Sequence, residues 1–327
     1  MSAIHFIFSI LLATPSVFAA TFETPVKEGD RLVLKGFEAQ VLLTAQASPV
    51  LKVSGVDETK AEGSYVIERK ENIIEIRMVE FNGKTAWKNI LPKAATQMRK
   101  IEISGLPLPT EIQLRGGSVV AQRWTKDLKV SLTQGRVSLV NGAGSAQVYV
   151  QKGEVNIQDH TGRVAVDGYS GTCALRNITG DVDVAWFSGQ LGMEKIRGSV
   201  TMSTQQTTAK LNSGAGSVQF SNGKGSLVLQ AFQGRMEGQN QEGNVTVLMP
   251  MDSEVDVKSK AGKVAVTVPA GSGAQVNLFT MDGEISVPGE LRVVKLSSEK
   301  SVRGKLRGDA QRASVFVRSQ EGSILLK

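Results

Sequence analysis

Several residue types that carry chemistry are scarce in this chain of 327 residues. Its one cysteine, Cys173, excludes a disulfide within the chain, and no cysteine that could carry a lipid follows the N-terminal segment. Of its two histidines, only His160 lies beyond the first 20 residues. One histidine and one cysteine exclude a metal cluster built from those ligands. No phosphate-binding glycine loop or nucleophile elbow is present, so we expect no cofactor and no metal.

Charge is also absent from the first 20 residues, where an apolar core over 6–12 precedes Pro15 and Ser16. This pattern predicts a secretory signal peptide over 1–19, with cleavage after Ala19. No later segment is long and apolar enough to span a membrane. We therefore expect an exported protein of the periplasm or the cell surface.

Glycine is abundant and recurs with a fixed period. Fifteen nine-residue units run from residue 117 to the unit that starts at 243, and thirteen of them begin with glycine. Each reads G-x-Φ-x-Φ followed by mostly polar residues, as in the unit that begins at Gly180. The third residue is apolar in all fifteen units and the fifth in fourteen, with Gly238 the exception. Residues two apart on a strand share a face, so these positions point inward.

The period predicts an all-β fold, a parallel β-solenoid in which stacked units share one core. Asn141, Asp159 and Asn177 occupy the seventh position of every second unit, which favours two strands per 18-residue coil. The alternation fades after about residue 200, so a three-sided coil stays open. The G-G-x-G-x-D corners of calcium-binding β-rolls are missing, which excludes that class.

The sequence around this array predicts four regions. They are the signal peptide over 1–19, irregular strand-rich coils with an N-terminal cap over 20–116, the regular solenoid over 117–250, and irregular C-terminal coils over 251–327. Alternating runs such as that over 37–43 support the second region, and rungs near 254–257 and 283–287 support the last.

The runs over 36–44, 51–55, 73–76 and 101–105 resemble the opening of auto-transporter adhesin heads of the GIN type. The downstream G-x-V-x-V ladder resembles the related adhesin-like β-solenoid domains of bacterial envelope proteins. The resemblance implies a non-catalytic binding or scaffolding module of the cell envelope. Its partner would be an envelope polymer or a surface protein, with an anionic glycan among the candidates, and not a nucleic acid.

Two basic segments are candidate contact sites. Residues 290–327 hold nine basic and four acidic residues, and the chain as a whole has a net charge of +7. An insertion over 84–100 has five basic residues and no acidic one. It reads either as a basic amphipathic element or as a lid over the flank of the solenoid. The candidate binding residues are Arg303, Lys305, Arg307, Arg312, Trp87 and Lys88.

Two other functions stay open. Parallel β-helices also carry polysaccharide lyases and hydrolases, and Asp181 with Asp183, both placed outward on one strand with Arg163 stacked beside Asp181, is the best local carboxylate candidate. His160 is expected in a corner, bonded to Asp159 or to solvent, and Cys173 is expected to be a buried hydrophobe. The third possibility is a structural protein that polymerises end to end.

Overall fold

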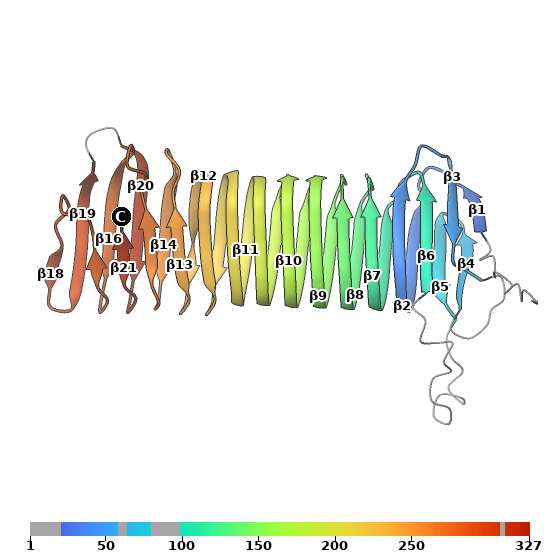
Figure 1. Ribbon diagram of the computed structural model, residues 1–327, viewed down its shortest axis with the longest axis horizontal. Coiled ribbons are helices and arrows are strands. Elements are labelled where there is room, and N and C mark those ends of the chain that lie inside the picture. The colour runs from blue at the N-terminus through green and yellow to red at the C-terminus, as the bar shows by residue number, and fades with distance from the viewer. Residues whose placement is uncertain (1–20, 58–63, 80–98, 308–310) are drawn as a thin grey trace, which may run out of the picture.

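The structure, a computed structural model, describes residues 21–57, 64–79, 99–307 and 311–327, without the side chains of 311 and 312. The predicted signal peptide and residues 84–98 of the insertion therefore lie outside the described residues. The regular elements of the described part are all β-strands, joined in one sheet of 21 strands with mostly parallel pairings. They lie side by side in an elongated stack (Figure 1). The predicted all-β class and the mainly parallel pairing are confirmed.

The middle of the stack is regular. Val164 pairs in parallel with Val182, and this offset of 18 residues repeats along the middle strands. We call each 18-residue repeat a rung, and each rung has two halves that meet at a glycine. The half before this glycine, 164–168 in one rung, forms face A of the stack, and the half after it, 172–176, forms face B. The strands are β7 (Thr110–Gln122), β8 (Leu128–Val140), β9 (Ala146–Thr161), β10 (Val164–Thr179), β11 (Val182–Asn222) and β12 (Ser226–Asn240).

Both halves of each rung turn apolar side chains into one core. The third residue of all fifteen nine-residue units is buried, and so is every apolar fifth residue. Intervening residues such as Asp183 and Gln190 point to solvent. One unit buries only two such side chains, roughly 1.5–3 kcal/mol each. That is too little to order nine residues alone, so each rung depends on its neighbours.

The two corners of a rung differ in their backbone. At one corner, residues spaced by 18, including Asn141, Asp159 and Asn177, take left-handed φ values of 53–55°. The series continues through Lys195, Ser213 and Ala231, so the corner persists where the Asn and Asp residues end. At another corner the backbones approach too closely for a side chain. A Cβ on Gly171, whose φ is 125°, would lie 1.9 Å from the carbonyl oxygen of Gly153.

Glycine also accommodates the bulkiest core residues. The ring of Trp186 occupies the space beside Gly168, its partner in the neighbouring rung, where a Cβ would lie 2.0 Å from the ring. The ring of Phe220 fills the equivalent space beside Gly238, the one fifth position that is not apolar. Large and small residues thus compensate between rungs and keep the core at normal density.

At the N-terminal end, the chain folds back over its own first rung. β2 lies between β7 on one side and β5 and β6 on the other, all in parallel. Antiparallel strands follow outside these: β4 pairs with β5, β3 with β6 and β1 with β3. The bounds are β1 (Thr21–Pro25), β2 (Arg31–Ala45), β3 (Val50–Ser54), β4 (Tyr65–Lys70), β5 (Ile73–Met78) and β6 (Arg99–Gly105).

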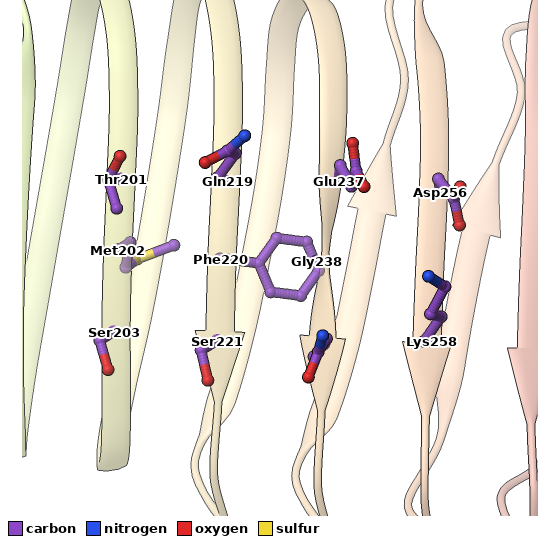
Figure 2. Close-up of a pocket in the computed structure, with 11 residues that line it drawn as sticks. Thr201, Met202, Ser203, Gln219, Phe220, Ser221, Glu237, Gly238, Asp256 and Lys258 are labelled. Atoms are coloured by element: carbon purple, nitrogen blue, oxygen red, sulfur yellow. The ribbon is translucent and has the colours of Figure 1, made fainter.

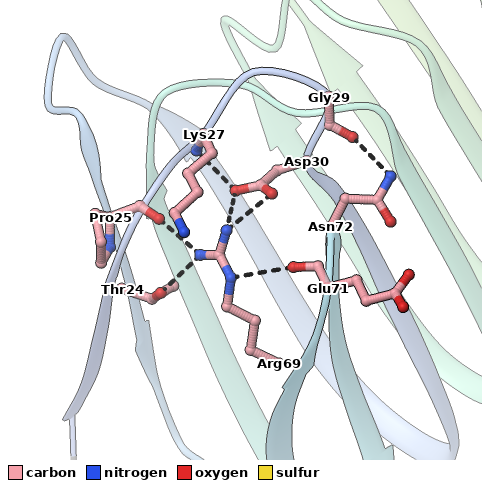
Figure 3. Close-up of polar contacts among 8 residues, drawn as sticks. All are labelled: Thr24, Pro25, Lys27, Gly29, Asp30, Arg69, Glu71 and Asn72. Atoms are coloured by element: carbon pink, nitrogen blue, oxygen red, sulfur yellow. Dashed lines mark hydrogen bonds and ion pairs between the residues drawn. The ribbon is translucent and has the colours of Figure 1, made fainter.

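A buried ion pair ties these outer strands together (Figure 3). The guanidinium of Arg69 on β4 donates to both carboxylate oxygens of Asp30, at 2.9 and 2.7 Å, and Asp30 is only 3% exposed. The same guanidinium donates to Thr24 Oγ1 at 3.0 Å and to the carbonyl of Pro25 at 2.7 Å. Asp30 also accepts the backbone N–H of Lys27 at 2.7 Å. The network holds β1, the start of β2 and the β4–β5 hairpin in place.

The C-terminal end repeats this arrangement. The last two strands, β20 and β21, lie between β14–β15 and β16–β17, and every one of these pairings is parallel. β19 then pairs antiparallel with β16, and β18 with β19. The bounds are β13 (Asn244–Leu248), β14 (Glu254–Ser259), β15 (Val264–Thr267), β16 (Gly273–Thr280), β17 (Ile285–Ser286), β18 (Val294–Leu296), β19 (Glu299–Leu306), β20 (Gln311–Ser319) and β21 (Ile324–Leu326).

Candidate functional site

A groove of about 490 Å³ crosses the outer surface of face A over β8 to β11. Its lining comes from outward residues of successive rungs, which the 18-residue register aligns in columns. Small side chains, Ala165 and Ala185, leave room between the longer ones. The groove therefore exists because alanine replaces larger outward residues at these positions.

Aromatic side chains lie in this groove and beside it: Tyr149 lines the groove, and Tyr169 and Phe187 lie two residues beyond the lining residues Asp167 and Ala185. Tyr149, Tyr169 and Phe187 are 47%, 56% and 38% exposed, and they are three of the five exposed aromatic residues in the described part of the chain. The rings of Tyr169 and Phe187, one rung apart, stack with centroids 4.7 Å apart and planes 5° from parallel. Tyr149 lies one rung before Tyr169, opposite Asp167. Exposed aromatic residues grouped in this way are typical of a binding surface.

The polar groups of the groove are available to a ligand. Asp167 is exposed, and neither its carboxylate nor the hydroxyls of Tyr149 and Tyr169 have a hydrogen-bond partner among the described residues. Asp183 faces Arg163 at 4.0 Å, and both side chains are more than half exposed. Exposed donors and acceptors beside aromatic rings can bind hydroxyl groups without a desolvation cost to the fold.

Lys129, at the edge of the groove, is held by Glu111 of the preceding rung. Its Nζ lies 3.1 Å from Glu111 Oε1. Hydrogen bonds from Gln113 and Lys129 lower the pKa of Glu111 below its ordinary value. The carboxylate therefore stays charged and keeps Lys129 at this edge.

A second, polar groove of about 390 Å³ continues along face A toward the C-terminal end. Figure 2 shows its outward side chains in two rows that run across the rungs. One row contains Thr201, Gln219, Glu237 and Asp256, and the other contains Ser203, Ser221 and Lys258. The Phe220 ring lies beneath Gly238 and forms part of the floor. Hydroxyl, amide and charged groups form the two rows, while Met202 and Phe220 make the floor between them apolar.

The predicted binding residues fall in different places. Arg303 and Lys305 point outward from β19 at the C-terminal end of face A. Arg307 is engaged by the fold, because its guanidinium donates to the carbonyls of Val268 and Pro269 at 2.9 and 2.7 Å. The side chain of Arg312 lies outside the described residues, and so do Trp87 and Lys88.

The carboxylate candidates are split. Asp181 and Asp183 are both exposed, as expected, but β11 begins at Val182, so Asp181 lies just before the strand, where it accepts the backbone N–H of Ser199 at 3.2 Å. The backbone of Arg163 aligns with Asp181 as expected, whereas its guanidinium lies toward Asp183. Sequence reasoning therefore identified half of the groove and missed its aromatic residues. A signal was present, because Tyr169 and Phe187 are 18 residues apart, at the eighth position of their units.

The one histidine of the described chain is part of the core. His160 is 4% exposed and its Nε2 lies 2.9 Å from the carbonyl of Gly144, so the predicted contact with Asp159 or solvent was wrong. Burial lowers the pKa of this imidazole, and the hydrogen bond to Gly144 opposes the shift. Cys173 is fully buried, as expected for a small hydrophobe, and burial raises the pKa of its thiol.

Within the described ranges, no three His, Cys, Asp or Glu residues are grouped so as to hold a metal ion. In that part of the chain, no helix is long and apolar enough to cross a membrane.

No known protein family and no curated protein matches this sequence. Two solved structures are similar to it at low identity. A candidate cell adhesion protein from Clostridium sporogenes is 10% identical over 94% of this chain and 99% of its own, with a TM-score of 0.19. A candidate adhesin from Bacteroides fragilis is 13% identical over 96% and 99%, with a TM-score of 0.28. At these TM-scores neither likeness carries an argument about this chain.

Proposed function

We propose that this chain is a non-catalytic, adhesin-like binding module of the bacterial envelope, which is exported and remains in the periplasm or at the cell surface. Its scaffold is a two-sided parallel β-solenoid closed at each end by antiparallel strands. The constant 18-residue register supports the two-sided coil, and the outer positions of β4 and β18 support the caps. The predicted signal peptide over 1–19 is the basis for export.

The bound partner is a glycan, and face A is the surface that contacts it. The observation that carries this proposal is that Tyr149, which lines the groove, and the stacked rings of Tyr169 and Phe187 beside the groove are all exposed on the same surface. One side of a sugar ring presents C–H groups, which pack against aromatic rings, while its hydroxyl groups need donors and acceptors. The Asp167 carboxylate and the tyrosine hydroxyls meet that second requirement. A stack of rungs is a rigid surface, so little conformational entropy is lost on binding.

The exposure of the carboxylates favours binding over catalysis. A general acid that cleaves a glycosidic bond needs a raised pKa, which burial in an apolar site provides. Asp167 and Asp183 are both exposed, so neither lies in the apolar surroundings that a general acid requires. These carboxylates are suited to hydrogen bonding with hydroxyl groups.

The test is co-sedimentation of the mature chain with isolated envelope fractions and with insoluble polysaccharides such as cellulose and chitin. We expect at least one of these to bind, without release of soluble sugar. The double variant Tyr169→Ala/Phe187→Ala should lower the affinity about tenfold to a hundredfold, because each aromatic contact contributes about 0.5–1.5 kcal/mol beyond its buried area.

Phe37→Ala is the matched control. Phe37 is also an exposed aromatic residue, but it lies on β2 against Arg115, outside the groove. The Phe37→Ala variant should bind as the wild type does. Unchanged binding by Tyr169→Ala/Phe187→Ala would refute this part of face A as the contact site, and release of soluble sugar would favour the enzyme alternative.

A further inference from the structure

Basic side chains meet at the C-terminal end of face A, from strands that are far apart in the sequence. Lys258 on β14 lies opposite Arg318 on β20. Arg303 and Lys305 lie on β19, which is separated from β20 by β16. All four side chains are exposed and point away from the core. We call Lys258, Arg303, Lys305 and Arg318 the cation patch.

The fold leaves most of this charge uncompensated. Lys258, Arg303 and Arg318 have no ion pair or side-chain hydrogen bond among the described residues. Three acidic residues belong to the same surface: Glu254 and Asp256 on β14, and Glu299 at the start of β19. The excess of positive charge therefore lies over β20 and β19, where Arg318 and Arg303 have no such contact among the described residues.

Aromatic side chains alternate with the cations. Phe316, 36% exposed, lies on β20 beside Arg318, and Phe279 on β16 lies opposite Arg318. Adjacent strands are about 4.8 Å apart, so the four strands from β14 to β19 span about 14 Å. A patch of this length can contact several anionic groups of one extended chain, but it is too open to enclose a single small anion.

We propose that the cation patch binds the acidic groups of a linear anionic polysaccharide whose rings lie along the rest of face A. Continuity of the surface supports a polysaccharide: Lys258 belongs both to the patch and to the polar groove, and the aromatic groove follows on the same face. Identifying the polymer as a polysaccharide rests on the proposed function, whereas the anion contact does not. A nucleic acid would use only the cations and Phe316, and it serves as a contrasting probe.

The experiment compares polygalacturonate, its methyl-esterified form and poly(dT) as ligands, in about 50 and about 200 mM NaCl. Esterification removes the charge and keeps the sugar backbone. We expect polygalacturonate to bind more tightly than the ester and to lose roughly tenfold or more in affinity at the higher salt, because the release of counterions on binding is then less favourable. Arg303→Gln/Arg318→Gln should weaken polygalacturonate binding about tenfold, since an exposed ionic contact contributes a factor of about two to five.

The matched control is Lys152→Gln/Lys210→Gln, which changes the net charge equally at exposed positions outside face A. It should bind as the wild type does. An equal loss in the control would overturn the proposal, because net charge would then account for the attraction. So would equal affinity for acid and ester, or tighter binding of poly(dT).

The groove variant Tyr169→Ala/Phe187→Ala separates this proposal from the proposed function. If the groove proposal fails and the patch is correct, that variant binds polygalacturonate as the wild type does, and Arg303→Gln/Arg318→Gln still weakens binding. If the patch proposal fails and the groove is correct, the groove variant binds both polygalacturonate and its methyl ester more weakly than the wild type does. The arginine variant then binds both polymers as the wild type does.

Discussion

The contact between Gly168 and Trp186 allows a sharp test of how the rungs pack. Gly168 is buried on β10, and the strand register pairs it with Trp186 on β11. A Cβ added at Gly168 would lie 2.0, 2.3 and 2.6 Å from three carbons of the indole ring, and no backbone atom is among these nearest contacts. Normal carbon–carbon contacts are about 3.5–4.0 Å. The ring must therefore move by more than an ångström inside a packed core.

The energies follow from that geometry. Gly168→Val should destabilise the fold by about 3 kcal/mol, at the upper end of the range for overpacking. Trp186→Val should cost about 3 kcal/mol, because it leaves a cavity beside Gly168. The double variant Gly168→Val/Trp186→Val restores two ordinary core residues to adjacent rungs, so we expect it to cost only about 1–2 kcal/mol. The coupling energy would then be about 4 kcal/mol, large for a contacting pair.

The measurement is urea unfolding followed by far-ultraviolet circular dichroism, since the variants remove a tryptophan fluorophore. Gly192→Val is the control: Gly192 is exposed on face B, where a Cβ meets nothing closer than 4.0 Å. It should be neutral or slightly stabilising, because valine suits a strand better than glycine does. Additive losses in the double variant would refute the compensation between these two residues.

Three further predictions concern the core, the buried histidine and the N-terminal end. Val182→Asp should unfold the chain, because it buries a charge in an apolar core. Asp183→Ala on the same strand should change the free energy of unfolding by less than about 0.5 kcal/mol. If thermal melts show that both variants are tolerated equally, the inward orientation of Val182 is wrong. His160 has a lowered folded-state pKa, so the free energy of unfolding should be constant above the unfolded pKa of about 6.5 and should fall as the pH drops below it. In urea midpoints measured against pH, His160→Gln should flatten this dependence. An unchanged pH dependence in the variant would refute the assignment to the buried imidazole. Asp30→Ala should cost about 3 kcal/mol, because it leaves the Arg69 guanidinium without its carboxylate, whereas Lys52→Ala, which breaks the exposed pair with Glu23, should cost less than about 1 kcal/mol. Equal melting temperatures for these two variants would contradict the role of the Asp30 network.

The regular part of the fold could be predicted because its physics is local. Alternation of apolar residues defines the inward side of a strand, and the recurring glycine marks the corners, so the buried positions from Val119 to Val247 follow from nine-residue windows. The alternating corner was visible at Asn141, Asp159 and Asn177, since Asn and Asp tolerate left-handed φ. The corner could not be predicted at Lys195, which takes the same conformation, because lysine has no preference for left-handed φ and stacking on the neighbouring rungs imposes the geometry.

Features that depend on contacts between rungs could not be found in this way. The absence of an apolar side chain at Gly238 is an irregularity in the sequence, and only the position of Phe220 explains it. The aromatic groove was missed for a related reason. Tyr149 and Tyr169 are 20 residues apart and occupy different positions in their units, so their proximity requires the 18-residue register. The cation patch needs still more, since Lys258 and Arg318 are 60 residues apart.

The two ends of the chain show the strongest limit of repeat-based reasoning and also a consequence for stability. A regular stack would end in its first and last strands, each paired on one side only and free to fray. Here β2 and β20 are each paired on both sides, and the antiparallel strands outside them, apart from β1, come from residues further inside the chain. Fraying of β20 and β21, or of β2 once β1 has separated from β3, must therefore break two sets of backbone hydrogen bonds at once. Such an arrangement favours slow unfolding, which the exported module that we propose would need because its single cysteine can form no disulfide within the chain.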